Sequence, residues 1–123
     1  MSAHILFVDD EIPIRETLSL FFKVKGMSVT TAGTGAEALK LAENTRFDLV
    51  ILDVKLADEN GLDLLENFKQ KYPSVPVAMF TAFGDDPERR NQATAKGASG
   101  WFRKGDSFHE LFNGISEILA NAS

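Results

Sequence analysis

Short apolar stretches and helix-like patterns alternate five times along the chain. The expected strands lie at residues 5–8, 28–32, 49–52, 75–80 and 100–102. The third, 49–52, is apolar throughout, as expected of a strand covered on both faces. Strand–helix units that recur every two dozen residues or so predict a doubly wound α/β fold, with a parallel sheet and helices on both of its faces.

The helices between these strands begin and end at recognisable residues. Thr34 and Glu37 have the spacing of a capping box, and so do Ser107 and Glu110. Gly26 follows the first helical pattern and is typical of a left-handed helix end. These signals place the helix boundaries independently of the apolar pattern.

The fourth expected helix differs from the others. Between Glu88 and Lys96 its only apolar residues are Ala93 and Ala95, so it has little to bury and should be among the easier parts to shift. The acidic pair Asp85-Asp86 stands just before Pro87, and we interpret it as helix capping rather than chemistry.

Composition narrows the class of protein. The 123 residues are 44% hydrophobic and 25% charged, which indicates one globular domain. The absence of cysteine excludes disulfides, thiolate zinc sites and thiol catalysis. A net charge of −5 argues against nucleic-acid binding. Apolar runs are too short for a membrane span or a signal peptide, so we expect a cytoplasmic protein.

Chemistry-bearing residues follow the expected strands. Ligands of doubly wound sheets bind beyond the carboxyl ends of the strands, where this chain has Asp9, Asp10, Asp53, Thr81 and Lys104. Two carboxylates about 4 Å apart repel by about 4 kcal/mol at an effective dielectric of about 20. A divalent cation with oxygen ligands removes that penalty, and Mg²⁺ suits such a site. With Mg²⁺ bound, three carboxylates and one lysine become neutral overall, so the site can accept a phosphoryl group on a carboxylate.

Four motifs occur in order, each at the end of an expected strand. They are Phe7-Val8-Asp9-Asp10-Glu11, Leu52-Asp53 with Gly61 eight residues on, Thr81-Ala82, and Lys96-Gly97-Ala98 leading into Lys104. Over essentially its whole length, 1–123, the chain resembles the receiver domain of two-component response regulators. The resemblance implies a flavodoxin-like (βα)5 fold whose five-stranded parallel sheet has the order 2-1-3-4-5.

The resemblance also implies a metal site around the phosphoacceptor. Asp53 would accept the phosphoryl group and contact Mg²⁺. Asp10 would bind the metal directly, Asp9 largely through a metal-bound water, and the backbone carbonyl of Lys55 would be a further ligand.

Other residues would contact the phosphoryl group or transmit its arrival. By the same resemblance, Thr81 would donate a hydrogen bond to the phosphoryl group and Lys104 would pair with it. Trp101 occupies the aromatic switch position of the family. The signalling surface would comprise the fourth helix, the fifth strand and the fifth helix.

Three positions depart from the family pattern. Gly105 replaces a proline that usually follows a cis bond, so we expect a trans Lys104–Gly105 bond and a looser approach of Lys104 to Asp53. Ala57 replaces a second common proline. Trp101 is bulkier than the usual Tyr or Phe, so we expect its ring to stay largely outward while the fourth helix adjusts.

The implied function is a phosphorelay switch rather than an enzyme with a free substrate. A sensor histidine kinase or a phosphotransfer protein would donate to Asp53, and slow hydrolysis would reset the protein. A downstream protein or an output domain would receive the signal. A dimer that forms on phosphorylation stays open as an alternative, whereas direct contact with nucleic acid or membrane is not expected.

Two rival functions also stay open. A small phosphatase with an aspartyl-phosphate intermediate would need Asp-x-Asp after the first strand, where this chain has Asp9-Asp10-Glu11. A flavodoxin-like cofactor binder would need a phosphate-binding loop rich in Gly, Ser and Thr at the same place. Incubation with acetyl phosphate and Mg²⁺, followed by intact mass measurement, separates the three functions.

Overall fold

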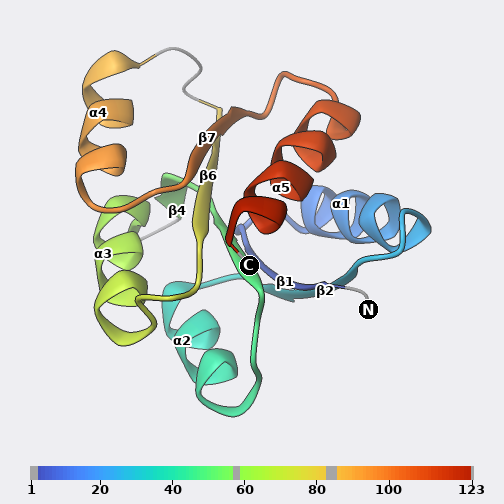
Figure 1. The fold of residues 1–123 in the computed structure, drawn as a ribbon, viewed down its shortest axis with the longest axis horizontal. Helices are drawn as coiled ribbons and strands as arrows, with labels where there is room; N and C mark the ends of the chain where they lie inside the picture. The colour runs from blue at the N-terminus through green and yellow to red at the C-terminus, as the bar shows by residue number, and fades with distance from the viewer. Residues whose placement is uncertain (1–2, 57–58, 83–85, 123) are drawn as a thin grey trace.

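A five-stranded parallel sheet runs through the middle of the molecule (Figure 1). This computed structural model describes residues 3–56, 59–82 and 86–122. The strands of the sheet are β1 (His4–Val8), β2 (Ser28–Ala32), β3 (Leu49–Leu52), β6 (Val77–Thr81) and β7 (Gly100–Arg103). Their order, β2-β1-β3-β6-β7, is the 2-1-3-4-5 order that the family resemblance implies, so the predicted fold class is confirmed.

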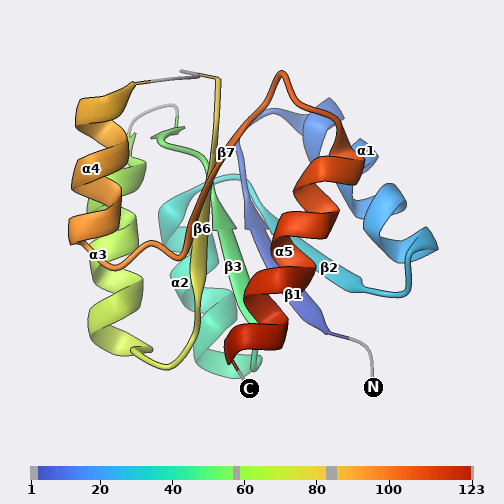
Figure 2. The ribbon, with the colours of Figure 1, turned by 45° about the horizontal axis from the view of Figure 1, so that its top comes forward.

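Helices cover both faces of this sheet, as Figure 2 shows. They are α1 (Ile12–Val24), α2 (Gly35–Asn44), α3 (Gly61–Lys71), α4 (Pro87–Ala95) and α5 (Phe108–Ala122). One apolar cluster joins the sheet to α1 and α5, and the other joins it to α2, α3 and α4. No helix of the described residues is both long and apolar enough to cross a membrane.

The strand β3 lies at the centre of the sheet and is buried along its whole length. Leu49 and Ile51 point into the cluster under α1 and α5, whereas Val50 and Leu52 point into the opposite cluster. Successive side chains of a strand alternate between the two faces, so both faces of β3 must be apolar. This explains the unbroken apolar run and leaves Asp53 at the end of a fully buried strand.

The predicted helix caps are present. Thr34 Oγ1 accepts a hydrogen bond from the Glu37 N–H at 3.1 Å, and Ser107 Oγ accepts one from the Glu110 N–H at 3.1 Å. Gly26 has a φ of 94°, the left-handed conformation that its position at the end of α1 predicts.

The helix α4 is held by few apolar contacts, as expected. Asp86 Oδ1 accepts from the Arg89 N–H at 3.2 Å, which confirms its capping role, while Asp85 lies outside the described residues. Ala93 is the one buried side chain of α4, all of which is described.

A small antiparallel hairpin follows β3 and was not expected from the sequence. Its strands are β4 (Lys55–Leu56) and β5 (Glu59–Asn60), and Ala57, one of the departures from the family pattern, lies outside the described residues. The Gly61 N–H donates to the carbonyl of Val54 at 2.7 Å, and a Cβ at Gly61 would collide with the backbone of residues 53 and 54. Glycine at this position therefore lets the chain close tightly behind Asp53.

Candidate functional site

Four carboxylates meet at the carboxyl edge of the sheet. The parallel register places Val8 beside Leu52, so the residues that follow β1 and β3 emerge next to each other. Each of Asp9, Asp10, Glu11 and Asp53 has an oxygen that lies within 4.8 Å of one on every other member. The predicted convergence of the three aspartates is confirmed, and Glu11 adds a fourth carboxylate that the sequence analysis had not assigned to the site.

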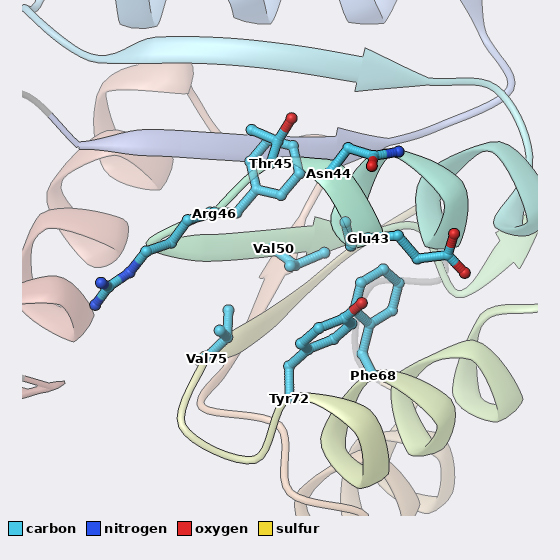
Figure 3. Close-up of a pocket in the computed structure, with 10 residues that line it drawn as sticks. Glu43, Asn44, Thr45, Arg46, Val50, Phe68, Tyr72 and Val75 are labelled. Atoms are coloured by element: carbon cyan, nitrogen blue, oxygen red, sulfur yellow. The ribbon is translucent and has the colours of Figure 1, made fainter.

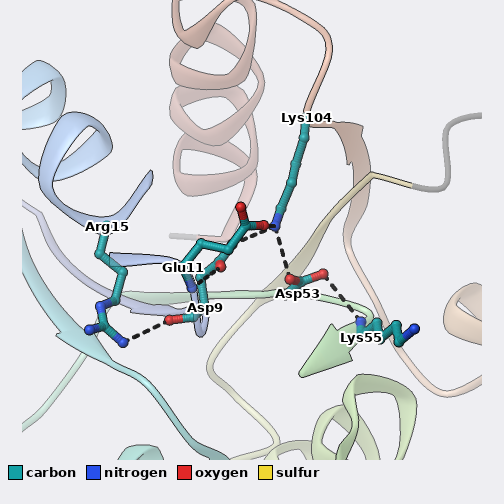
Figure 4. Close-up of polar contacts among 6 residues, drawn as sticks. All are labelled: Asp9, Glu11, Arg15, Asp53, Lys55 and Lys104. Atoms are coloured by element: carbon teal, nitrogen blue, oxygen red, sulfur yellow. Dashed lines mark hydrogen bonds and ion pairs between the residues drawn. The ribbon is translucent and has the colours of Figure 1, made fainter. Parts of the chain in front are cut away.

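The ammonium of Lys104 lies among these carboxylates (Figure 4). Its Nζ is 2.8 Å from Asp9 Oδ2, 3.0 Å from Glu11 Oε1 and 2.9 Å from Asp53 Oδ2. The ammonium donates hydrogen bonds to Glu11 and Asp53, whereas its contact with Asp9 Oδ2 is an ion pair without hydrogen-bond geometry.

The backbone around Lys104 explains this close approach. The structure has no cis peptide bond among the residues it describes, so the predicted trans Lys104–Gly105 bond is confirmed. The looser approach of Lys104 to Asp53 that we expected from this bond is wrong. The Lys104 N–H donates to the carbonyl of Thr81 at 2.8 Å, which holds the start of the loop against β6 and aims the long side chain into the site.

Burial and charge act in opposite directions on the two central groups. Asp53 is 4% exposed, and burial raises the pKa of its carboxyl above the ordinary value, although the hydrogen bond and positive charge of Lys104 act to lower it. Burial alone would lower the pKa of Lys104, but its close contacts with Asp9, Asp53 and Glu11 outweigh that effect and raise it. The site therefore keeps its lysine charged, whereas a negative charge on Asp53 is costly.

The loop after β1 is fixed by hydrogen bonds as well as by charge. Asp9 is fully buried, and its Oδ1 accepts from the Glu11 N–H at 2.9 Å. The carbonyl of Asp9 accepts from Arg15 Nη1 at 3.0 Å. Neither Glu11 nor Arg15 was assigned to the site from the sequence. Glu11 could have been assigned, because it is the third acid of the run Asp9-Asp10-Glu11. Arg15 could not, because it binds the backbone carbonyl of Asp9 and such a contact leaves no pattern of residue types.

The residues present fit a divalent cation with oxygen ligands. Asp9 Oδ2 is buried and makes its ion pair with Lys104 without a well-aligned hydrogen bond, so this oxygen is under-coordinated. Asp10 is exposed. A hollow of about 300 Å³ lies beside the cluster, lined by Asp10, Glu11, Asp53, Lys55, Leu56, Ala82 and Lys104. Oxygen ligands and room for water are what Mg²⁺ requires.

The remaining predicted residues lie close to this cluster in the fold. Thr81 is fully buried at the end of β6. Lys55 lines the hollow, and its N–H donates to Asp53 Oδ1 at 3.2 Å. The predicted role of the Lys55 backbone carbonyl as a metal ligand stays a prediction.

Trp101 lies on β7, two residues before the end of that strand. It is the second residue of β7 and pairs with Met79, whereas Thr81 pairs with Arg103. Its ring is half-buried against the apolar cluster under α2, α3 and α4. The expectation that the ring stays largely outward while α4 adjusts concerns activation, and it stays a prediction.

A second hollow lies at the opposite edge of the sheet (Figure 3). It has a volume of about 380 Å³ and opens between the C-terminal ends of α2 and α3. Phe47, Val50, Phe68, Tyr72 and Val75 give it a mostly apolar lining. The acidic cluster and Lys104 are at the other edge, so the phosphoryl chemistry predicted from the sequence does not belong to this hollow.

Comparison with known proteins gives a consistent result. A family model described as the response regulator receiver domain matches residues 5–116. The chain is 36% identical over 115 residues to the probable transcriptional regulatory protein TcrX of Mycobacterium tuberculosis, covering 94% of this chain and 49% of that protein. It is 31% identical over 121 residues to the transcriptional regulatory protein GlrR of Escherichia coli, covering 98% of this chain and 27% of that protein. The chain thus spans about half or less of these relatives.

Solved structures share the whole fold. The structure of a CheY-like response regulator receiver domain protein from Methanospirillum hungatei superposes with a TM-score of 0.93 and is 29% identical in sequence. The match covers 99% of this chain and 97% of that one. The structure of CheY4, a chemotaxis protein of Vibrio cholerae, superposes with a TM-score of 0.90 and is 32% identical in sequence. The match covers 96% of this chain and 99% of that one.

Proposed function

Because the chain belongs to the family of response regulator receiver domains, we propose that it accepts a phosphoryl group on Asp53 in a Mg²⁺-dependent reaction. The observation that carries this proposal is the position of Asp53. Its carboxylate ends a buried strand, lies among three further carboxylates and is 2.9 Å from Lys104. Residues 1–123 would form the receiver domain of a cytoplasmic phosphorelay.

The charge of the site supports a requirement for metal. Four carboxylates and one ammonium leave a formal charge of −3, one unit more negative than the −2 that the three aspartates and Lys104 alone would give. Asp9, Asp10, Asp53 and the backbone carbonyl of Lys55 would hold Mg²⁺, which when bound would bring this charge to −1 and would stabilise the added phosphoryl oxygens. Without a cation, a further dianionic group on Asp53 would be strongly disfavoured.

The residues of the chain account for the transfer itself. An Asp53 oxygen attacks the phosphorus of a phosphohistidine on a kinase or phosphotransfer protein. A P–O bond forms, the P–N bond breaks, and the imidazole leaves. Lys104 pairs with a phosphoryl oxygen, and the Thr81 hydroxyl donates a hydrogen bond to another. Later attack by water on phosphorus breaks the bond between phosphorus and the Asp53 oxygen, releases inorganic phosphate and restores the carboxylate. The protein would therefore act as a switch rather than as an enzyme with a free substrate.

The signalling face would comprise α4, β7 and α5. The weak apolar attachment of α4 supports this assignment, since a helix with one buried side chain can shift without disrupting the core. Trp101 on β7 packs half-buried on the α4 side of the sheet and would respond to that shift. The output domain or downstream protein would bind this face.

Mass spectrometry after incubation with acetyl phosphate tests the proposal. We expect one phosphoryl adduct with Mg²⁺, none with EDTA, and none in Asp53→Asn. An adduct on Asp9 or Asp10 would support the phosphatase alternative, and the absence of any adduct would support a cofactor binder. Equal labelling of Asp53→Asn would overturn the assignment of the phosphoacceptor.

A further inference from the structure

Glu59 lies on the loop that follows Asp53 and contacts a helix from another part of the fold. Its Oε1 accepts a hydrogen bond from the N–H of Gly35, the first residue of α2, at 2.8 Å and 24 positions away in sequence. The first N–H groups of a helix have no partner inside the helix and carry partial positive charge. Glu59 therefore caps α2 from outside that helix.

The contact depends on close approach of the two segments. Gly35 is buried, and a Cβ at this position would collide with the Glu59 carboxylate. The helix also has its own cap, because Thr34 Oγ1 accepts from the Glu37 N–H. Since α2 is already capped locally, the bond from Glu59 matters most for the loop that carries it.

That loop holds the residues beside the phosphoacceptor. In the hairpin of β4 and β5, Glu59 pairs with Leu56 and Asn60 pairs with Lys55. The Lys55 N–H in turn donates to Asp53 Oδ1. Anchoring Glu59 to α2 therefore restrains the strand whose backbone contacts Asp53.

We infer that Glu59 is a positioning residue for the metal site. By anchoring the hairpin to the N-terminus of α2, it holds the Lys55 backbone in the orientation that Mg²⁺ binding requires. The inference rests on the proposed function, in which the Lys55 carbonyl is a metal ligand. Glu59 acts through Lys55 and is not itself a member of the carboxylate cluster.

Calorimetric titration of the intact chain with Mg²⁺ tests this role. We expect Glu59→Ala to weaken Mg²⁺ binding about tenfold, the size of effect typical when a residue that supports a metal ligand is lost. Glu59→Gln should recover most of the affinity, because its amide oxygen can accept the same N–H although the negative charge is gone. Thr34→Ala is the matched control, since it removes the other cap of α2 without touching the hairpin.

The outcomes separate this inference from the proposed function. Wild-type Mg²⁺ affinity in Glu59→Ala, or an equal loss in Thr34→Ala, would overturn the positioning role and leave the proposed function standing. Equal loss of Mg²⁺ affinity in Glu59→Gln and Glu59→Ala would also overturn the positioning role, because the loss would then come from the missing negative charge alone. A wild-type protein that neither binds Mg²⁺ nor is labelled by acetyl phosphate would overturn both.

Discussion

Lys104 Nζ lies 2.9 Å from Asp53 Oδ2, although the two residues are 51 positions apart in sequence. The same ammonium contacts Asp9 and Glu11, so a single positive charge bridges three of the four carboxylates. Lys104 thus occupies the central position at which positive charge is required, both for the fold and for the proposed chemistry.

Replacing Lys104 should destabilise the protein strongly in the absence of metal. Lys104→Met leaves Asp9 and Asp53 buried without a cation, and breaking a buried ion pair costs about 3–5 kcal/mol. Mg²⁺ should restore part of the loss. Thermal unfolding in EDTA and in Mg²⁺ measures both effects.

The control for this variant is a lysine in an exposed ion pair. Lys96 pairs with Glu66, and both side chains are substantially exposed, so Lys96→Met should cost less than about 1 kcal/mol and show no rescue by Mg²⁺. Equal losses in the two variants would contradict the central role of Lys104.

The raised pKa of Asp53 predicts that the contribution of this group to the stability of the folded state decreases as pH rises. The folded state holds this proton more tightly than the unfolded chain, whose carboxyl has the ordinary pKa of 3.8, so ionisation of Asp53 opposes folding. Stability contributed by this group falls as pH rises from about 3.8 through the raised folded pKa. In EDTA, Asp53→Asn should therefore unfold at a higher temperature than wild type at pH 7.

The difference between Asp53→Asn and wild type should shrink as pH is lowered to 3.8 and below. Unfolding temperatures measured for both proteins across this range check the sign. A difference that grows toward low pH would mean that the carboxylate is stabilised in the folded state, against the effect of its burial.

Glu11 should contribute to metal affinity although it is partly exposed. Glu11→Gln reduces the negative charge of the site and weakens one contact of Lys104. Because exposed charge pairs are worth about 0.2–1 kcal/mol, we expect Mg²⁺ binding to weaken about two- to fivefold. Glu16→Gln, an exposed acid of α1 that is not in the carboxylate cluster, should leave the affinity unchanged. Calorimetric titration with Mg²⁺ measures the affinity of both variants.

Trp101 should report Mg²⁺ binding. It is the single tryptophan and lies on β7, the strand that ends next to Lys104. A dication among the carboxylates changes the local field and the contacts of Lys104, so the emission of Trp101 should change in a Mg²⁺ titration. Asp10→Ala is the control and should show no change. A flat signal while calorimetry detects binding would show that Trp101 is uncoupled from the site.

The residues at the strand ends could be predicted from the sequence because a parallel sheet brings equivalent ends together. Once 5–8 and 49–52 are assigned as strands, the order 2-1-3-4-5 implied by the family resemblance makes them neighbours. Asp9 and Asp53 are then expected to emerge side by side, as they do. The fourth carboxylate, Glu11, was within reach of the same argument, since it belongs to the same acidic run.

Contacts to the backbone could not be predicted in this way. Arg15 binds the carbonyl of Asp9, and Glu59 binds the N–H of Gly35. Main-chain groups occur at every position, so such pairs leave no pattern of residue types. The approach of Lys104 to Asp53 was mispredicted for a related reason: local preference at Gly105 says nothing about how far a long side chain reaches.

The single buried side chain of α4 has a thermodynamic consequence. Burying the Ala93 methyl group contributes about 1 kcal/mol, which is close to thermal energy. Alternative placements of this helix therefore lie within reach of ordinary fluctuations, and a mixture of them should exist before any phosphoryl group arrives. Under the proposed function, modification at Asp53 would shift the populations of these placements, and a partner that prefers one placement would shift the same equilibrium.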